Sequence, residues 1–125
     1  MSTLLIDTAH PEASVSVATG DKIVATQSWR SDNALGSALL VAIDDVLAKE
    51  GIARSDIECV AVHRGPGHYS ALRAGIVTAS LLADVLAVPL KHFATNDVTS
   101  PTFLKELDRS ESVTMVQPQY EALQT

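Results

Sequence analysis

The sequence is poor in aromatic residues, in cysteine and in positive charge, and each shortage excludes a class of protein. Phe, Trp and Tyr make up 4% of the 125 residues, so any core must be built from aliphatic and alanine side chains. The single cysteine excludes an internal disulfide and favours a reducing compartment. Nine Lys and Arg against fifteen Asp and Glu give a net charge of −6, which argues against a broad nucleic-acid surface.

Long apolar runs are also missing. Arg73 and Asp84 bracket the longest such segment, which therefore falls short of the ~18 apolar residues of a membrane span. The first six residues have no basic region, so we expect no signal peptide and a cytoplasmic protein without membrane contact. Hydrophobic residues still amount to 46% of the chain, enough to build the core of one domain.

Alternating polarity predicts three strands near the N-terminus. The segments 3–6, 13–18 and 23–29 are apolar or alternating, and Gly20-Asp21 indicates a hairpin between the last two. The opening unit is therefore an antiparallel meander.

Two helices and two further strands follow. The first helix is expected to run to Lys49 and to stop at Gly51, because its apolar residues recur at helical spacing. A buried strand at 57–62 leads into a second helix that ends at Leu86, and 88–93 forms a short fifth strand. The order is β-β-β-α-β-α-β. We predict an α/β fold with helices packed on a mixed five-stranded sheet, since each strand that returns through a helix lies parallel to the first.

The C-terminal part carries weaker signals. Pro101 is expected to interrupt a helix that starts before it, and Leu104 with Leu107 predicts one helical turn against the domain. We place the domain at residues 1–109 and a C-terminal tail at 110–125.

The most informative stretch, Gly65-Pro66-Gly67, lies between the fourth strand and the second helix. The glycines permit positive φ and close backbone approach, and the proline stiffens the turn. Tyr69 or Ser70 can cap the helix, whose free N–H groups then point at the loop. Such a corner can hold an anion, although it lacks the Gly-Lys-Ser/Thr of a Walker loop. An anion site and a purely structural corner both stay open.

Asp7 and Thr8 end the first strand and are expected to lie near this loop. Asp7 can orient a metal-bound water and Thr8 can contact phosphate, but the interpretation we favour is that Asp7 caps the turn. The candidates for a phosphate or nucleotide loop are Asp7, Thr8, Arg64, Gly65, Pro66 and Gly67.

Metal and nucleophile chemistry have little support in the sequence. His63 and His68 flank the loop, but two imidazoles do not make a zinc site, so we predict no metal ligands. Ser70 lacks a Gly-x-Ser-x-Gly elbow, so a serine hydrolase is not expected. Cys59 lies in an apolar strand and is predicted to be an inert core thiol. We assign no catalytic residue.

The two helices carry more apolar residues than one sheet face is expected to cover. Ala71, Gly75, Ala79 and Ala83 recur every four residues, and such a row lets another helix approach closely. The outer faces favour a protein partner; the alternative is that all these residues are core. The predicted partner interface consists of Leu39, Leu40, Ile43, Leu47, Leu72, Gly75, Ile76, Ala79, Leu82, Ala83 and Leu86.

These segments resemble a known family. Residues 4–9, Leu-Leu-Ile-Asp-Thr-Ala, and 13–18 resemble the opening of the TsaB (YeaZ) family, and 39–47 resembles its first helix. Residues 62–75 resemble the family's signature Gly-Arg-Gly-Pro-Gly-Ser-Phe-Thr-Gly-Leu-Arg-x-Gly. The resemblance covers roughly residues 3–93.

The resemblance implies a ribonuclease H-like domain of the actin-like ATPase superfamily and a non-catalytic role. TsaB, with the related TsaD and the ATPase TsaE, supports transfer of a threonylcarbamoyl group to adenosine beside the tRNA anticodon. It binds TsaD, or a second copy of itself, through its two helices. The implied partners are thus TsaD-type and TsaE-type proteins, with a homodimer in isolation and no strong direct nucleic-acid binding. No cofactor is expected to bind tightly to this chain alone, while ATP and Mg are possible at a partner interface.

The sequence departs from the family pattern at His63, His68 and Ala71, where the signature has Gly, Ser and Gly. Residues 35–37 replace the usual His-Ser-Glu. These changes weigh against a preserved small-molecule site and less against a partner role. The family has a second domain that the sequence after Phe93 is too short to form, so we expect a shortened form. A nucleotide-binding enzyme and a metallopeptidase remain as rival functions, the latter without a ligand set.

Overall fold

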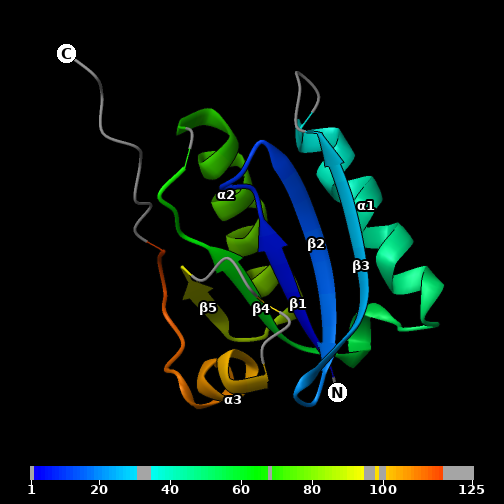
Figure 1. The fold of residues 1–125 in the computed structure, drawn as a ribbon. Coiled ribbons are helices and arrows are strands. Elements are labelled where there is room, and N and C mark those ends of the chain that lie inside the picture. Colours follow the sequence, from blue (N-terminus) through cyan, green and yellow to red (C-terminus); the bar gives the residue numbers. More distant parts are fainter. Residues whose placement is uncertain (1, 31–34, 68, 95–97, 99–100, 117–125) are drawn as a thin grey trace.

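One mixed sheet with helices on both faces forms the protein (Figure 1). The computed structural model describes residues 2–30, 35–67, 69–94, 98 and 101–116. The strands are β1 (Ser2–Asp7), β2 (Glu12–Thr19), β3 (Lys22–Arg30), β4 (Ile57–His63) and β5 (Leu90–Phe93). The helices are α1 (Leu35–Lys49), α2 (Tyr69–Leu86) and α3 (Pro101–Arg109), with a 3-10 turn, η1 (Arg54–Asp56), before β4.

The sheet order is β3-β2-β1-β4-β5. Strands β1, β2 and β3 pair antiparallel, whereas β4 runs parallel to both β1 and β5. The predicted α/β class and mixed five-stranded sheet are confirmed. In the β1–β4 register, Ile6 lies opposite Val62, so the carboxyl ends of these two strands reach the same edge of the sheet.

The sheet has a core on each face. Strand β1 shows the division, since Leu4 and Ile6 belong to the core under α1 and α2, while Leu5 belongs to the core under α3. Helix α1 lies against β2 and β3, and α2 lies against β1, β4 and β5. The smaller core consists of Leu5, Ala18, Ala61, Phe93, Leu104 and Leu107.

Both long helices end in the same motif, in which a left-handed residue reverses the chain. After α1 that residue is Gly51 (φ 62°), and Ile52 N–H donates to the Leu47 carbonyl at 3.0 Å. After α2 it is Ala87 (φ 55°), and Val88 N–H donates to the Ala83 carbonyl at 3.0 Å. The predicted ends of both helices are confirmed, although the second uses alanine where glycine is preferred.

The C-terminal region is more regular than predicted. Pro101 does not interrupt a helix but is the first residue of α3, where its missing N–H costs nothing. Beyond α3, Val113 N–H donates to the Leu90 carbonyl at 2.8 Å and Val116 is buried. Part of the predicted tail therefore packs on β5, and the division at 109/110 stays a prediction.

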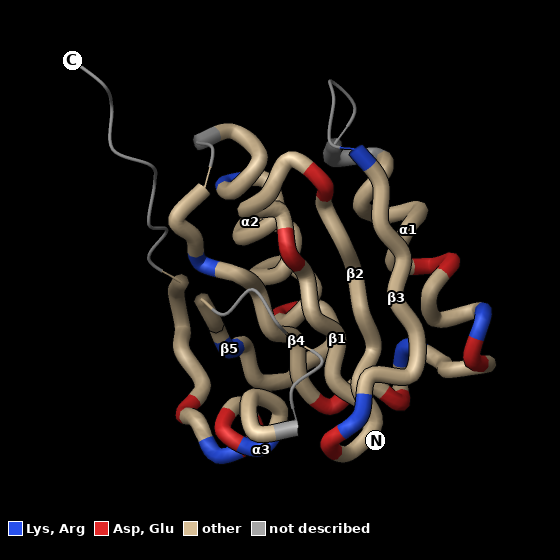
Figure 2. Tube along the Cα trace, viewed as in Figure 1, with Lys and Arg blue, Asp and Glu red and all other residues tan. Residues whose placement is uncertain are grey.

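Charge is unevenly spread over the elements (Figure 2). Most of α2 is uncharged, since Arg73 and Asp84 are its only charged residues among 18. On α1, Asp44 accepts from Arg54 at 2.7 Å, and this contact raises the pKa of the guanidinium. Both partners are exposed, so the pair adds little stability. No helix within the described ranges is long and apolar enough to cross a bilayer.

We predict that Ala87→Gly stabilises the protein. A left-handed alanine costs about 1–2 kcal/mol and glycine costs about 0.5–1 kcal/mol in lost chain entropy, so the net gain in unfolding free energy is about 0.5–1 kcal/mol. Urea titration followed by circular dichroism measures it. The matched control Ala74→Gly, in the second turn of the same helix, should destabilise by about 1 kcal/mol. A loss of stability in Ala87→Gly contradicts the prediction.

Candidate functional site

The end of β1 and the loop after β4 meet at one edge of the sheet, as the sequence predicts. The contact is backbone to backbone, because a Cβ on Gly67 would lie 2.8 Å from the Cα and carbonyl oxygen of Ala9. A Cβ on Gly75 would likewise overlap the Thr8 hydroxyl. Glycine is therefore required at both positions for β1 to reach the loop and α2.

Asp7 holds the turn that follows β1. Its Oδ1 accepts from Ala9 N–H at 2.9 Å, which is the capping role that we favoured. His10 Nδ1 lies 3.1 Å and 3.0 Å from the two carboxylate oxygens of Asp7. The Asp7 side chain is 17% exposed and that of His10 is 38% exposed, so this pair lies at the boundary of solvent.

His63, at the end of β4, completes a cluster that the sequence did not predict. Its ring is 1% exposed and lies edge-on to those of His10 and Phe93, with both centroid distances 5.2 Å. Gly65 N–H donates to Nδ1 at 3.0 Å, which places the proton of the neutral ring on Nε2. Ligand atoms of Asp7, His10 and His63 all lie within 4.8 Å of one another.

Most of the predicted phosphate-loop residues are buried or hydrogen-bonded within the protein, which favours a packing role over an anion site. Thr8 is 1% exposed, and its hydroxyl has no hydrogen-bond partner among the described residues. Gly65 has φ 105° and donates to His63. Arg64 N–H donates to the Phe93 carbonyl at 2.9 Å. Pro66 alone in the Gly65–Gly67 turn is exposed, and His68 lies outside the described residues.

Most of the predicted partner interface is core, and this is a correction. Periodicity identified the apolar residues but not the direction in which they face. The sheet already covers those with exposures of 7% or less, namely Leu39, Ile43, Leu47, Leu72, Ile76, Ala79 and Ala83. Gly75 is also buried, and Leu82 and Leu86 pack partly against the same core. Within the small-residue row, Gly75 lets α2 approach Thr8 at the end of β1 closely, and Ala79 and Ala83 are part of the core under the sheet.

Other apolar residues occupy the outer faces of the two helices. Of the predicted set, Leu40 is exposed, at 54%. Its exposed neighbours were not predicted, because helical periodicity alone gives no reason to prefer their side of the helix. We call outer helix surface the set Leu40, Val41, Val77, Leu81 and Val85, whose exposures lie between 48% and 78%.

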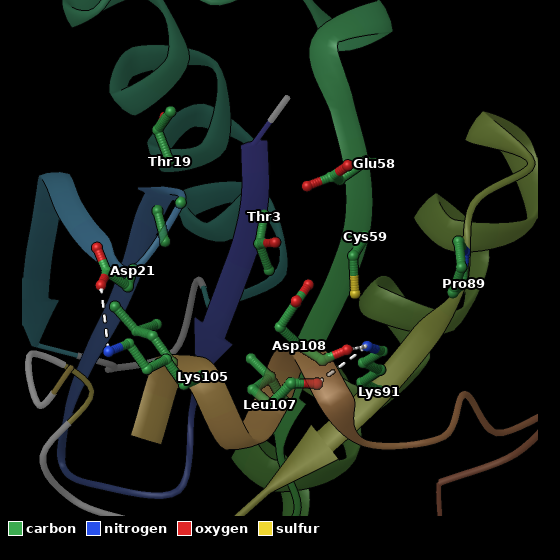
Figure 3. Close-up of a pocket in the computed structure, with 13 residues that line it drawn as sticks. Thr3, Thr19, Asp21, Glu58, Cys59, Pro89, Lys91, Lys105, Leu107 and Asp108 are labelled. Atoms are coloured by element: carbon green, nitrogen blue, oxygen red, sulfur yellow. Dashed lines mark hydrogen bonds and ion pairs between the residues drawn. The ribbon is translucent and has the colours of Figure 1, made fainter. Parts of the chain in front are cut away.

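A cavity of about 620 Å³ opens at the other end of the sheet, between the strands and α3 (Figure 3). Its lysines are engaged, since Lys91 Nζ donates to the Leu107 and Asp108 carbonyls at 2.9 Å and 3.0 Å, and Lys105 pairs with Asp21 at 3.9 Å. The lysine on β5 thus fastens the end of α3 to the sheet, and we assign this cavity a structural role.

Residues 32–98 match the family model described as TsaD, tRNA N6-adenosine threonylcarbamoyltransferase. The protein of that name from Syntrophotalea carbinolica is 43% identical over 53 residues, which is 42% of this chain. The one from Ralstonia pickettii is 39% identical over 71 residues, which is 55% of this chain. These matches span only 16% and 20% of the two relatives.

Two solved structures are also similar. YeaZ from Pseudomonas aeruginosa has a TM-score of 0.69 and 25% identity, over 74% of this chain and 43% of that chain. RuvC from Thermus thermophilus, in complex with a Holliday junction substrate, has a TM-score of 0.52 and 13% identity over 75% of this chain and 64% of that chain. The second likeness concerns the fold alone. Together they support the ribonuclease H-like type of α/β fold.

We predict that Gly75→Ala destabilises the fold because the new methyl group overlaps the Thr8 hydroxyl. Overpacking of this kind costs about 1–3 kcal/mol. Thr8→Ala removes the overlapping atoms, so the double variant should be more stable than Gly75→Ala. Urea unfolding of the four proteins gives the coupling free energy. Strictly additive effects contradict the contact.

We also predict a slow thiol at Cys59. Burial raises its pKa, and the positive charge of Lys91 offsets this only partly. Native protein should therefore react with a thiol reagent much more slowly than protein in urea. Unfolding releases a thiol of ordinary pKa, about 8.5. The contribution of the buried Cys59 thiol to the free energy of unfolding is therefore fully present below the unfolded-state pKa. This contribution is lost as the pH rises through the higher pKa of the folded state. Cys59→Ala should remove this dependence, and equal native and unfolded rates contradict the assignment.

Proposed function

Since this chain belongs to the TsaD family and is of its TsaB (YeaZ) type, we propose that it is a non-catalytic scaffold subunit of the tRNA threonylcarbamoyladenosine modification machinery. The chain spans less than half of the YeaZ chain that it resembles. It pairs with a TsaD-type enzyme, or with a second copy, through α1 and α2. The exposed apolar side chains of the outer helix surface carry this proposal.

The pattern on α2 favours an interface. Val77, Leu81 and Val85 are spaced four residues apart and therefore form one stripe, and their exposures are 48%, 61% and 78%. A contiguous apolar stripe in water is unfavourable unless a partner covers it. The sparse charge of α2 lowers the desolvation cost of covering it.

The partner follows from the part of the chain that matches. Residues 32–98 include α1, β4, α2 and β5, so a TsaD-type protein carries counterparts of the same two helices. Two proteins with similar helix pairs can pack them face to face in a pseudo-twofold arrangement, and two copies of this chain can do the same. A TsaE-type ATPase then acts on the assembled pair rather than on this chain alone.

Nucleotide binding is the second candidate, because Asp7 and Thr8 do lie beside the Gly65–Gly67 turn. The oxygens of Asp7 are engaged by Ala9 N–H and His10, and Thr8 is buried. We therefore expect ATP and Mg to bind weakly to the chain alone and to require a partner, as in the actin-like ATPase superfamily. Calorimetric titration with ATP and magnesium tests this, and tight binding by the isolated chain favours the enzyme.

We predict that Leu81→Asp weakens association at least tenfold, which is about 1.4 kcal/mol, because a carboxylate is buried in an apolar contact. Sedimentation velocity measures self-association, and a binding assay with a TsaD-type protein measures the heterologous pair. The variant should unfold at the same urea concentration as the parent, since Leu81 is exposed.

The matched control is Thr102→Asp, which places the same charge on α3, on the other face of the sheet. It should leave both associations unchanged. If Leu81→Asp associates as the parent does, or if the parent is a monomer that ignores a TsaD-type protein, the scaffold proposal is wrong.

A further inference from the structure

Asp7, His10 and His63 come from the end of β1, the turn after it and the end of β4. Their ligand atoms lie within 4.8 Å of one another. We propose that this cluster binds a divalent transition-metal ion, with Zn²⁺ as the representative. The site is separate from the outer helix surface and does not depend on the proposed scaffold role.

The donor types decide which ions suit the cluster. Two imidazoles and one carboxylate are ligands of zinc and of other first-row transition ions. Mg²⁺ prefers oxygen ligands and keeps several waters, so it fits poorly. Three protein ligands leave at least one position open for water. The sequence prediction of no metal considered His63 with His68, whereas the structure brings His63 to Asp7 and His10.

The Asp7–His10 half of the cluster is close to the geometry of a bound ion. Two ligands that each lie about 2.0–2.1 Å from one ion are at most about 4.2 Å apart, and His10 Nδ1 lies 3.0 Å from the nearer Asp7 oxygen. This nitrogen donates to the carboxylate, so an ion that binds here releases the Nδ1 proton to solvent. Ala9 N–H holds the other oxygen at 2.9 Å, which fixes the orientation of the carboxylate as outer hydrogen bonds do around metal ligands. The three ligand atoms lie within 4.8 Å of one another, so the cluster contracts when it binds an ion.

The third ligand couples the ion to the loop. Gly65 N–H occupies the Nδ1 lone pair of His63, and the proton of the neutral ring is then on Nε2. Coordination through Nε2 moves this proton to Nδ1, which can no longer accept from Gly65. Coordination through Nδ1 displaces Gly65 directly. In either case the metal breaks this hydrogen bond, so binding shifts the turn that begins α2.

The binding experiment uses the whole chain with its tags removed. Zn²⁺ should bind one ion per chain in calorimetry and raise the melting temperature, and Co²⁺ should give d–d absorption bands with the same stoichiometry. Mg²⁺ at the same concentrations should do neither. His10→Ala should weaken Zn²⁺ binding at least tenfold, and Asp7→Asn should do so while still accepting from Ala9 N–H.

The control is His92→Ala, because His92 is exposed on β5 and lies outside the cluster. It should bind Zn²⁺ as the parent does. His63 is buried, so His63→Ala can fail to fold; amide nitrogen shifts of Gly65 in the parent, with and without Zn²⁺, test its part instead. Zinc binding that is absent, or that survives unchanged in His10→Ala and Asp7→Asn, overturns the proposal. An unmoved Gly65 amide overturns the coupling to the loop.

Discussion

The close packing of the end of β1 against the backbone of α2 is the contact on which the rest of the structure depends. Thr8 lies on Gly75 and Ala9 lies on Gly67, with no room for a Cβ at either glycine. Residues 64–68 alone join the end of β4 to the start of α2. The parallel register of β1 and β4 brings His63 beside Asp7, and the small side chains of α2 lie toward the sheet.

The two sides of α2 differ in burial and in side-chain size. The inner side contains Gly75, Ala79 and Ala83, whose small size sets the depth at which the helix lies. The outer side contains larger β-branched and leucine residues that the monomer leaves exposed. A helix that only covered the sheet would carry polar residues there. The exposed apolar side of α2 fits the partner surface proposed above.

The sequence was sufficient for what local pattern decides. Alternation located the strands and Gly51 marked the end of α1, because each depends on neighbours along the chain. Pattern failed where the direction of a side chain depends on tertiary packing: the predicted interface included Leu72, which is core, and left out Leu81, which is exposed. The cluster was missed for a related reason, since only the β1–β4 register joins His63 to residues more than fifty positions earlier.

Substitutions on the inner side of α2, on its outer side and in the cluster of Asp7, His10 and His63 are expected to change different properties of the protein. The inner side of α2 contributes buried apolar contacts, so changes there affect the free energy of unfolding. The outer side is exposed in the monomer, so changes there leave the free energy of unfolding nearly untouched. The cluster at the strand ends differs from both, because His10 is half-exposed and its partner Asp7 is held by the turn. Since α2 begins at the loop beside the cluster and carries Val77, Leu81 and Val85 on its exposed side, this one helix connects the two proposed sites.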